Sequence, residues 1–349
     1  MKDAAGQNSV STQAFTIEVL AKGFVPTGNM SVPRVVHTAT TLANGKVLVL
    51  GDDPTSEVFD PTTGNFAVSG MPTTQRGQHT ATLLKDGKVL IAGGIFINAL
   101  ASAELYDAST GTFVATGNLT IARFGHTATR LADGRVLITG GVDNAGNPLS
   151  SAELFDEAAG TFIATGSLAN ARAGHTATLL KDGRVLMVGG TSIAAAEIYD
   201  PASGTFSATG NLHEWRLQHT ATLLANGQVV VIGGQGGASN ISLKTAEIFD
   251  PASGLFTQAA GVMESARAWH VGALLPSGQV LVAGGVDETG KTLTSAELFD
   301  PASGKFADTA DMTTARSSSA TAVLNDGTVL VTGGNDAEGA TLASAEIYK

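Results

Sequence analysis

The residues best suited to chemistry in this sequence are histidines that return at similar intervals, each three positions after an arginine. Six such pairs occur, at Arg34/His37, Arg76/His79, Arg123/His126, Arg172/His175, Arg216/His219 and Arg267/His270. A seventh arginine, Arg316, is followed by Ser319 at the histidine position. Because imidazole is a frequent metal ligand, this pattern first suggests a metal site.

Geometry argues against one metal shared by these histidines. If each histidine lies on its own sheet, neighbouring rings are separated by the distance between packed sheets, about 10 Å. One ion needs several nitrogens at about 2.1 Å, and nothing in the pattern groups the histidines in threes. We therefore expect each imidazole to be a hydrogen-bonded structural component, and we predict neither a metal site nor a cofactor.

Glutamates recur in step with the arginines. They are Glu57, Glu104, Glu153, Glu197, Glu247, Glu297 and Glu346. The equal numbers predict one Arg–Glu pair in each repeat or at each boundary between repeats. A buried pair of this kind fixes geometry more than it adds net stability, although the loss of one partner is costly.

Other catalytic and metal-binding patterns are weak. The acidic loops at 143–147 and 287–290 lack a full set of calcium ligands and are better interpreted as turns. No nucleophile elbow accompanies the histidines, so nothing indicates a Ser-His-Asp triad.

The repeated residues belong to elements that recur about every fifty residues. Residues 79–94 read HTATLLKDGKVLIAGG and residues 175–190 read HTATLLKDGRVLMVGG, identical at 13 of 16 positions. A strand rich in threonine and alanine leads through an Asp-Gly hairpin signal to a nearly all-apolar strand that ends at a double glycine. A third strand carries the glutamate, and an outer strand carries a phenylalanine. These elements predict an all-β fold with four antiparallel strands per repeat.

Seven repeats predict a seven-bladed β-propeller, and the two ends of the chain predict how it closes. The last repeat stops at Lys349, just after its third strand, while residues 23–30 match an outer strand at 205–212. A strand at about 22–28 should therefore complete the last blade, with Phe24 supplying the missing outer aromatic residue, so that no sheet edge stays open. We expect a flexible arm at 1–14 and a single propeller over 15–349.

Over residues 23–349 the chain resembles the kelch superfamily. Seven double-glycine or near-equivalent sites and seven Glu-x-[Phe/Tyr] sites carry the resemblance, with Gly51-Asp52 and the outer-strand phenylalanines as departures. The Arg-x-x-His and Asp-Gly-Lys/Arg-Val-Leu patterns look most like bacterial kelch repeats and the propeller of galactose-oxidase-like proteins. That resemblance suggests a copper-radical oxidase, which needs a cysteine cross-linked to a tyrosine. The sequence has no cysteine, so this chemistry is excluded.

The charge and hydropathy of the sequence limit the kinds of partner and the cellular location that we expect. A net charge of −11 argues against nucleic acid, and no apolar run is long enough to span a membrane. Residues 1–14 lack the apolar core of a signal peptide as written, although such a polar start equally fits a mature end left after cleavage. A chain without cysteine fits any compartment, including export without disulfides. We expect a monomer, and we favour an extracellular or periplasmic location over a cytoplasmic one.

Residues that break the repeat are the candidates for ligand binding. They lie in loops of variable length on one face of the predicted propeller, where function usually resides. They are His213, Glu214, Trp215, Gln218, Trp269, Gln78, Phe124 and Phe96. Aromatic faces beside polar groups suit a sugar ring or a peptide side chain. We expect the indoles of Trp215 and Trp269 to lie together near the channel mouth, with local packing as the alternative interpretation.

Three functions remain open from the sequence. The leading hypothesis is a non-enzymatic module that binds a protein, peptide or glycan on the variable-loop face. The second is an enzyme of lyase, epimerase or hydrolase type with its site at the channel mouth. The third is a structural, engineered or recently amplified repeat protein without an evolved ligand, which the low divergence between repeats favours.

Overall fold

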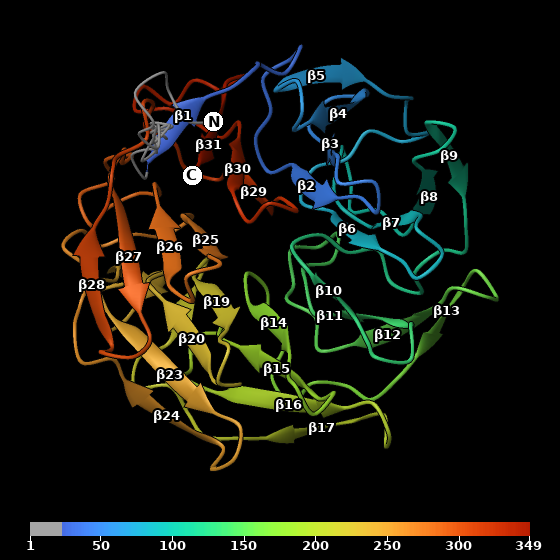
Figure 1. The fold of residues 1–349 in the computed structure, drawn as a ribbon. Helices are drawn as coiled ribbons and strands as arrows, with labels where there is room; N and C mark the ends of the chain where they lie inside the picture. The colour runs from blue at the N-terminus through green and yellow to red at the C-terminus, as the bar shows by residue number, and fades with distance from the viewer. Residues whose placement is uncertain (1–22) are drawn as a thin grey trace, which may run out of the picture.

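Seven four-stranded antiparallel sheets surround one axis (Figure 1). The computed structural model describes residues 23–349, so the arm predicted at 1–14 lies outside the described residues. We call each four-stranded sheet a blade and number the blades from the one that begins at Thr38. Residues 23–349 form no helix, hence none long and apolar enough to cross a membrane.

The four strands of each blade lie side by side, from an innermost strand at the axis to an outermost strand at the rim. The innermost are β2 (Thr38–Thr41), β6 (Thr80–Leu83), β10 (Thr127–Arg130), β14 (Thr176–Leu179), β19 (Thr220–Leu223), β25 (Val271–Leu274) and β29 (Ala320–Val323). The second are β3 (Val47–Leu50), β7 (Val89–Ala92), β11 (Val136–Thr139), β15 (Val185–Val188), β20 (Val229–Ile232), β26 (Val280–Ala283) and β30 (Val329–Thr332). The third are β4 (Ser56–Asp60), β8 (Ala103–Asp107), β12 (Ala152–Asp156), β16 (Ala196–Asp200), β23 (Ala246–Asp250), β27 (Ala296–Asp300) and β31 (Ala345–Tyr348). The outermost are β5 (Asn65–Val68), β9 (Thr112–Ala115), β13 (Thr161–Ala164), β17 (Thr205–Ala208), β24 (Leu255–Gln258), β28 (Lys305–Asp308) and β1 (Phe24–Pro26).

The sequence of each strand fits its distance from the axis. Threonine and alanine predominate in the innermost strands, where the blades crowd together. All four residues of each second strand are buried, because blades cover both of its faces. Further out, an aromatic ring on the third strand packs against one on the outer strand in every blade, with centroids 4.8–5.0 Å apart. The all-β propeller prediction is confirmed.

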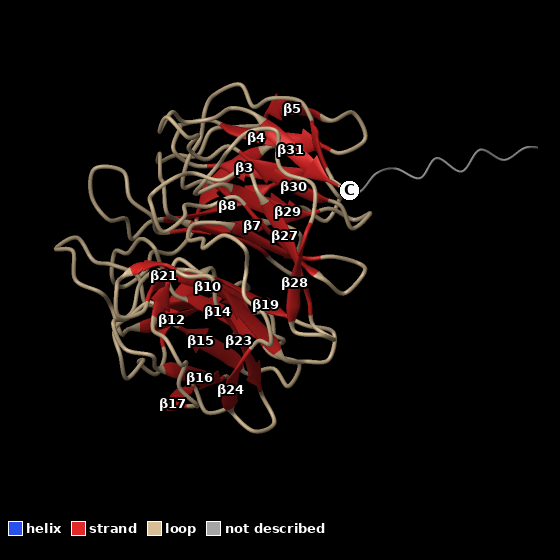
Figure 2. Cartoon of the chain, turned by 90° about the vertical axis from the view of Figure 1, so that its left-hand side faces the viewer, coloured by secondary structure: helices blue, strands red, loops and turns tan. Residues whose placement is uncertain are grey.

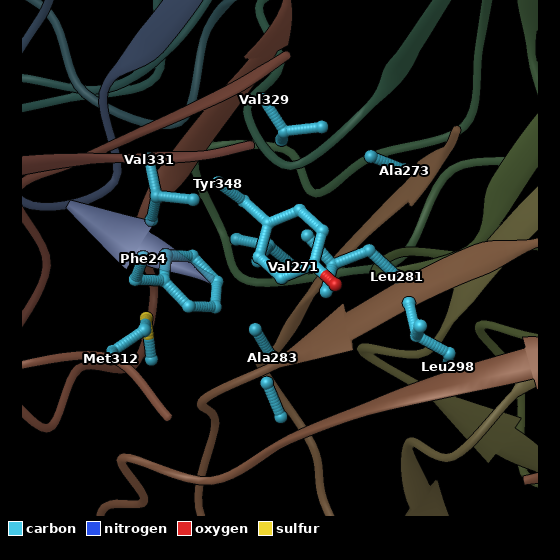
Figure 3. Packing of buried hydrophobic residues seen from close by; sticks show 11 residues of the cluster. Phe24, Val271, Ala273, Leu281, Ala283, Leu298, Met312, Val329, Val331 and Tyr348 are labelled. Carbon is cyan, nitrogen blue, oxygen red and sulfur yellow. The ribbon is translucent and has the colours of Figure 1, made fainter. Parts of the chain in front are cut away.

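The two ends of the described chain meet in blade seven. Strand β1 pairs antiparallel with β31, with Phe24 opposite Tyr348 and Pro26 opposite Glu346. The rings of Phe24 and Tyr348 pack edge to face 5.0 Å apart, in a cluster with Met312 and Val331 (Figure 3). Because β1 occupies the outer edge of β31, blade seven has the same four strands as the other blades.

Connections leave the blades on two opposite faces, seen edge-on in Figure 2. The hairpins between first and second strands and between third and fourth strands form what we call the hairpin face. The loops between second and third strands, and the connections from blade to blade, form the loop face. In blade five, segments of the loop face build a small sheet of β18 (Arg216–Leu217), β21 (Gln235–Gly236) and β22 (Ile241–Ser242). Isolated bridges repeat this pairing in blades two, three, six and seven, so the loops are tied to one another.

Candidate functional site

Each repeated arginine is buried and fixes the connection that leads into its own blade. In blade four, Nη2 of Arg172 donates to Oε1 of Glu197 at 2.5 Å, and Nη1 donates to the carbonyl of Gly189 at 2.8 Å. The other carboxylate oxygen of Glu197 accepts the N–H of Ala169 at 2.7 Å. The ion pair recurs in all seven blades at 2.5–3.2 Å. The predicted Arg–Glu pairing is confirmed, and the pairs lie within blades.

Each repeated histidine links its blade to the preceding blade. Nε2 of His79 is hydrogen-bonded to the hydroxyl of Thr38, at the start of the neighbouring innermost strand, at 3.0 Å. The corresponding pairs are Thr80/His126, Thr127/His175, Thr176/His219 and Thr220/His270, at 2.9–3.0 Å. His37 uses Thr332 instead, at 2.8 Å. These bonds confirm the prediction that the histidines are structural components.

Burial keeps these imidazoles neutral at ordinary pH. The six side chains lie in residues only 5–7% exposed. Loss of hydration, together with the positive charge of Arg76, lowers the pKa of His79 to about 3. The same causes act at the other five. A group with so low a pKa is a poor general base near neutral pH. Within residues 23–349, no three histidine, aspartate or glutamate side chains lie close enough to hold a metal ion.

The histidine link is lost once, between blades six and seven, and both of its partners change together. Ser319 replaces the histidine, and Val271 replaces the threonine on the preceding blade. The Ser319 hydroxyl instead donates to the carbonyl of Gly333 at 3.1 Å. No threonine hydroxyl is left behind that would need an imidazole.

A hollow of about 560 Å³ opens on the loop face, where the inner ends of the seven blades surround the axis. We call this place the channel mouth. Its lining consists of the six histidines, Ser319 and the residue immediately before each of these seven. We call those seven preceding residues the mouth ring: Val36, Gln78, Gly125, Gly174, Gln218, Trp269 and Ser318. Successive members are joined by backbone hydrogen bonds of 3.0–3.4 Å, from the N–H of one residue to the carbonyl of the member before it, in six links from Val36 to Ser318.

The mouth ring has an unusual backbone. All seven residues have φ between 47° and 63°, the left-handed region in which glycine is comfortable. Only Gly125 and Gly174 are glycines. A β-branched residue such as Val36 or a bulky one such as Trp269 is strained in this conformation. The fold therefore imposes the conformation, and five side chains are held at the hollow at an energetic cost.

Three of the predicted ligand-binding residues, Gln78, Gln218 and Trp269, line this hollow. His213 and Glu214 do not. Nδ1 of His213 is hydrogen-bonded to Oε2 of Glu247 at 2.8 Å, and Glu214 accepts the Thr245 hydroxyl at 2.8 Å. These two side chains support the Arg–Glu pair and the adjoining loop of blade five.

The three remaining candidates are also outside the hollow. Trp215 is half-buried, and its carbonyl accepts the N–H of Gly237 beside the small sheet of blade five. Phe124 forms a bridge with Val142, and Phe96 is 55% exposed on the loop of blade two. The expected meeting of both indoles at the channel mouth is wrong for Trp215, because Trp215 precedes the arginine of its repeat whereas Trp269 precedes the histidine.

Sequence reasoning missed Val36, Ser318 and Ser319 at the hollow. A signal was available, because the residue before each histidine reads Val, Gln, Gly, Gly, Gln and Trp, with Ser before Ser319. This is a varied position beside two repeated ones.

A second hollow, of about 650 Å³, lies on the hairpin face between blades two and three. Glu157 lines it and accepts the N–H groups of Asp86 at 2.8 Å and Lys85 at 3.2 Å. Four other blades have proline at the position of Glu157. Its contacts bind one hairpin to the next and need no ligand to explain them.

Among solved structures, the chain is similar to a fungal alcohol oxidase of the AA5 family in complex with copper. The TM-score is 0.78 at 18% identity, over 95% of this chain and 76% of that chain. At this identity the likeness concerns the fold alone, and a shared fold does not specify function. No curated protein sequence matches.

The residues present do not fit a copper-radical site. The sequence has no cysteine, and all three tyrosines are buried between blades. Their hydroxyl groups are hydrogen-bonded to Ser69, Thr165 and Thr309 at 2.7–2.9 Å, away from the channel.

The repeat itself is matched by the Kelch motif model over residues 217–263, which run from the second residue of β18 through blade five to the connection with blade six. The double glycine, the recurring glutamate and the hairpin glycine of this segment return around the ring of sheets. The chain is a kelch-type β-propeller.

Proposed function

We propose that this chain is a binding module that holds a protein, peptide or glycan over the hollow at the channel mouth. The observation that carries the proposal is the mouth ring, where five non-glycine residues keep left-handed backbone conformations around one cavity. Strained positions of this kind cluster at ligand sites, because packing alone gives no reason to retain them. The varied side chains sit on a repeated, rigid base, which is how scaffolds present binding residues.

Binding fits the hollow better than catalysis. Its ionisable lining groups are the six imidazoles, whose pKa values are strongly lowered by burial. Five of them also engage Nε2 with a threonine at the start of an innermost strand. A lyase, epimerase or hydrolase would need a group that exchanges protons near neutral pH, and the lining residues Gln78, Gln218, Ser318 and Trp269 do not provide one.

A repeat protein with no ligand would have no reason to diversify the mouth ring. The structural positions around it, such as the arginine and the hairpin glycine, hardly vary from blade to blade. Glycine relieves the backbone strain in blades three and four, yet five blades carry larger residues. This contrast favours a surface whose side chains bind a ligand over a surface without a ligand.

The two tryptophans of the chain provide the test. A Trp215→Phe variant leaves Trp269 as the only indole, and its fluorescence is then used to screen peptide and glycan collections. We expect a ligand to change the emission saturably and to shield Trp269 from acrylamide. The matched Trp269→Phe variant, which reports from Trp215, should respond little. Ligands that bind saturably but leave Trp269 as open to acrylamide as before would contradict the proposal.

A further inference from the structure

We infer that the loop face recognises a cationic partner, a peptide or protein segment rich in lysine or arginine. The inference rests on the proposed function and specifies the chemistry of its ligand. It comes from the distribution of charge over residues 23–349 and from the composition of the hollow.

The charges outside the buried ion pairs are unequally divided between the two faces. The seven buried arginines and their seven glutamates cancel within the blades. In the connections of the loop face, ten carboxylates then stand against two lysines. The carboxylates are those of Asp52, Asp53, Asp143, Glu214, Glu264, Asp287, Glu288, Asp311, Asp336 and Glu338, and the lysines are Lys244 and Lys291. On the strands and hairpins, twelve carboxylates are nearly balanced by nine basic side chains.

This division gives the loop face most of the net negative charge of the described chain. A concave surface of one sign raises the local concentration of ions of the opposite sign and speeds their association. The hollow is the concave part of this face. An anionic partner would be repelled by the same field, and a neutral sugar would gain nothing from it.

The hollow itself suits a cationic side chain. No arginine or lysine lines it, and its six imidazoles are neutral, so nothing in the lining repels a positive charge. Gln78 and Gln218 are exposed and offer amide oxygens, while Ser318 and Ser319 offer hydroxyl oxygens. Trp269 is the aromatic residue of the lining, and indole is the best partner for a lysine or arginine in a cation–π contact.

Fluorescein-labelled octalysine tests the inference by anisotropy against the full chain. We expect saturable binding that weakens as NaCl is raised. Fully acetylated octalysine has the same length without the charge, and chitohexaose represents a neutral glycan. Both should fail to compete with octalysine.

Two matched sets of substitutions locate the binding face. Glu264→Gln, Glu288→Gln, Asp311→Asn and Glu338→Gln together remove four exposed negative charges from the loop face. Ala158→Lys, Ala202→Lys, Ala252→Lys and Ala302→Lys add four positive charges at exposed turns of the hairpin face. Both sets change the net charge equally, and circular dichroism checks that each variant folds.

We expect the loop-face set to weaken octalysine binding about tenfold and the hairpin-face set by less than about threefold, because salt screens charges beyond about 8 Å. Equal weakening by the two sets would overturn the inference, since binding would then follow net charge alone. Tight binding of chitohexaose that shields Trp269 would overturn the cationic chemistry while leaving the proposed function intact. The acrylamide screen above judges the proposed function separately, because it does not depend on the charge of the ligand.

Discussion

The mouth ring shows how one residue position can serve both folding and recognition. The turn before each histidine must be left-handed so that the N–H of one ring member reaches the carbonyl of the member before it. Glycine meets this need in two blades, and five blades accept strain instead. Contact of these side chains with a ligand would explain why the strain is retained. Substitution at the ring positions measures how much the conformation costs in stability.

Replacing Val36 by glycine should stabilise the protein by about 0.5–1 kcal/mol, because glycine adopts the left-handed conformation of this position without the strain of a β-branched side chain. The reverse change, Gly125→Ala, should destabilise it by about 1 kcal/mol. A β-carbon at Gly125 would meet only Oε1 of Gln78, at 3.6 Å, so this variant isolates the backbone cost. Urea denaturation measures both effects, and a stabilising Gly125→Ala change would show that the ring is not strained.

Arg172→Ala tests the buried ion pairs. The arginine is fully buried, and its removal leaves Glu197 charged and unpaired inside blade four. We expect a loss of about 3–5 kcal/mol in the free energy of unfolding. Arg184→Ala is the matched control, because this exposed arginine pairs with Asp182 and should cost less than about 1 kcal/mol. Similar losses in the two variants would mean that burial does not govern the strength of the repeated pair.

Among the elements, the short strand β1 completes the last blade and so closes the ring of sheets. Its three paired residues cover the edge of β31, and Phe24 fills the cluster around Tyr348. Truncation before Asn29 should lower the melting temperature sharply and promote association through the exposed strand edge. A truncation before Gly23, which leaves β1 in place, is the reference. A monomer with the same melting curve as this reference would contradict closure by β1.

The elements also show what a sequence reveals and where it stops. Four strands per blade and the Arg–Glu pairs were predictable, because each depends on a local pattern present in every repeat. The sign of φ at Val36, Gln78 and Trp269 was not predictable, since these residue types rarely adopt positive values and only the surrounding ring imposes them. The small sheet of blade five likewise depends on contacts between loops distant in sequence. The prediction for Trp215 was wrong for a related reason, because Trp215 lies three positions before Gln218, the residue of its repeat that lines the hollow.

For the ring as a unit, the six buried histidines predict a stability that depends on pH. In the folded protein burial lowers the pKa of five of them to about 3 and that of His219 well below its ordinary value, whereas an exposed histidine titrates near 6.5. The unfolded chain therefore takes up protons first, and stability falls as pH drops from 6.5 toward 3. Between pH 7 and 5.5 we expect a loss of about 1 kcal/mol for each histidine. Urea denaturation across this range measures it, and a constant free energy of unfolding would contradict neutral, buried imidazoles.

The charge of the loop face and the position of the hollow together make Trp269 the centre of the binding surface. Trp215 is a natural control, because it is the same residue type, half-buried and on the same face, but lies outside the hollow. The dissociation constant for octalysine should rise about tenfold or more in Trp269→Ala, as expected for an aromatic anchor, and stay within about threefold in Trp215→Ala. Unchanged binding by Trp269→Ala, with both variants folded, would contradict recognition at the channel mouth.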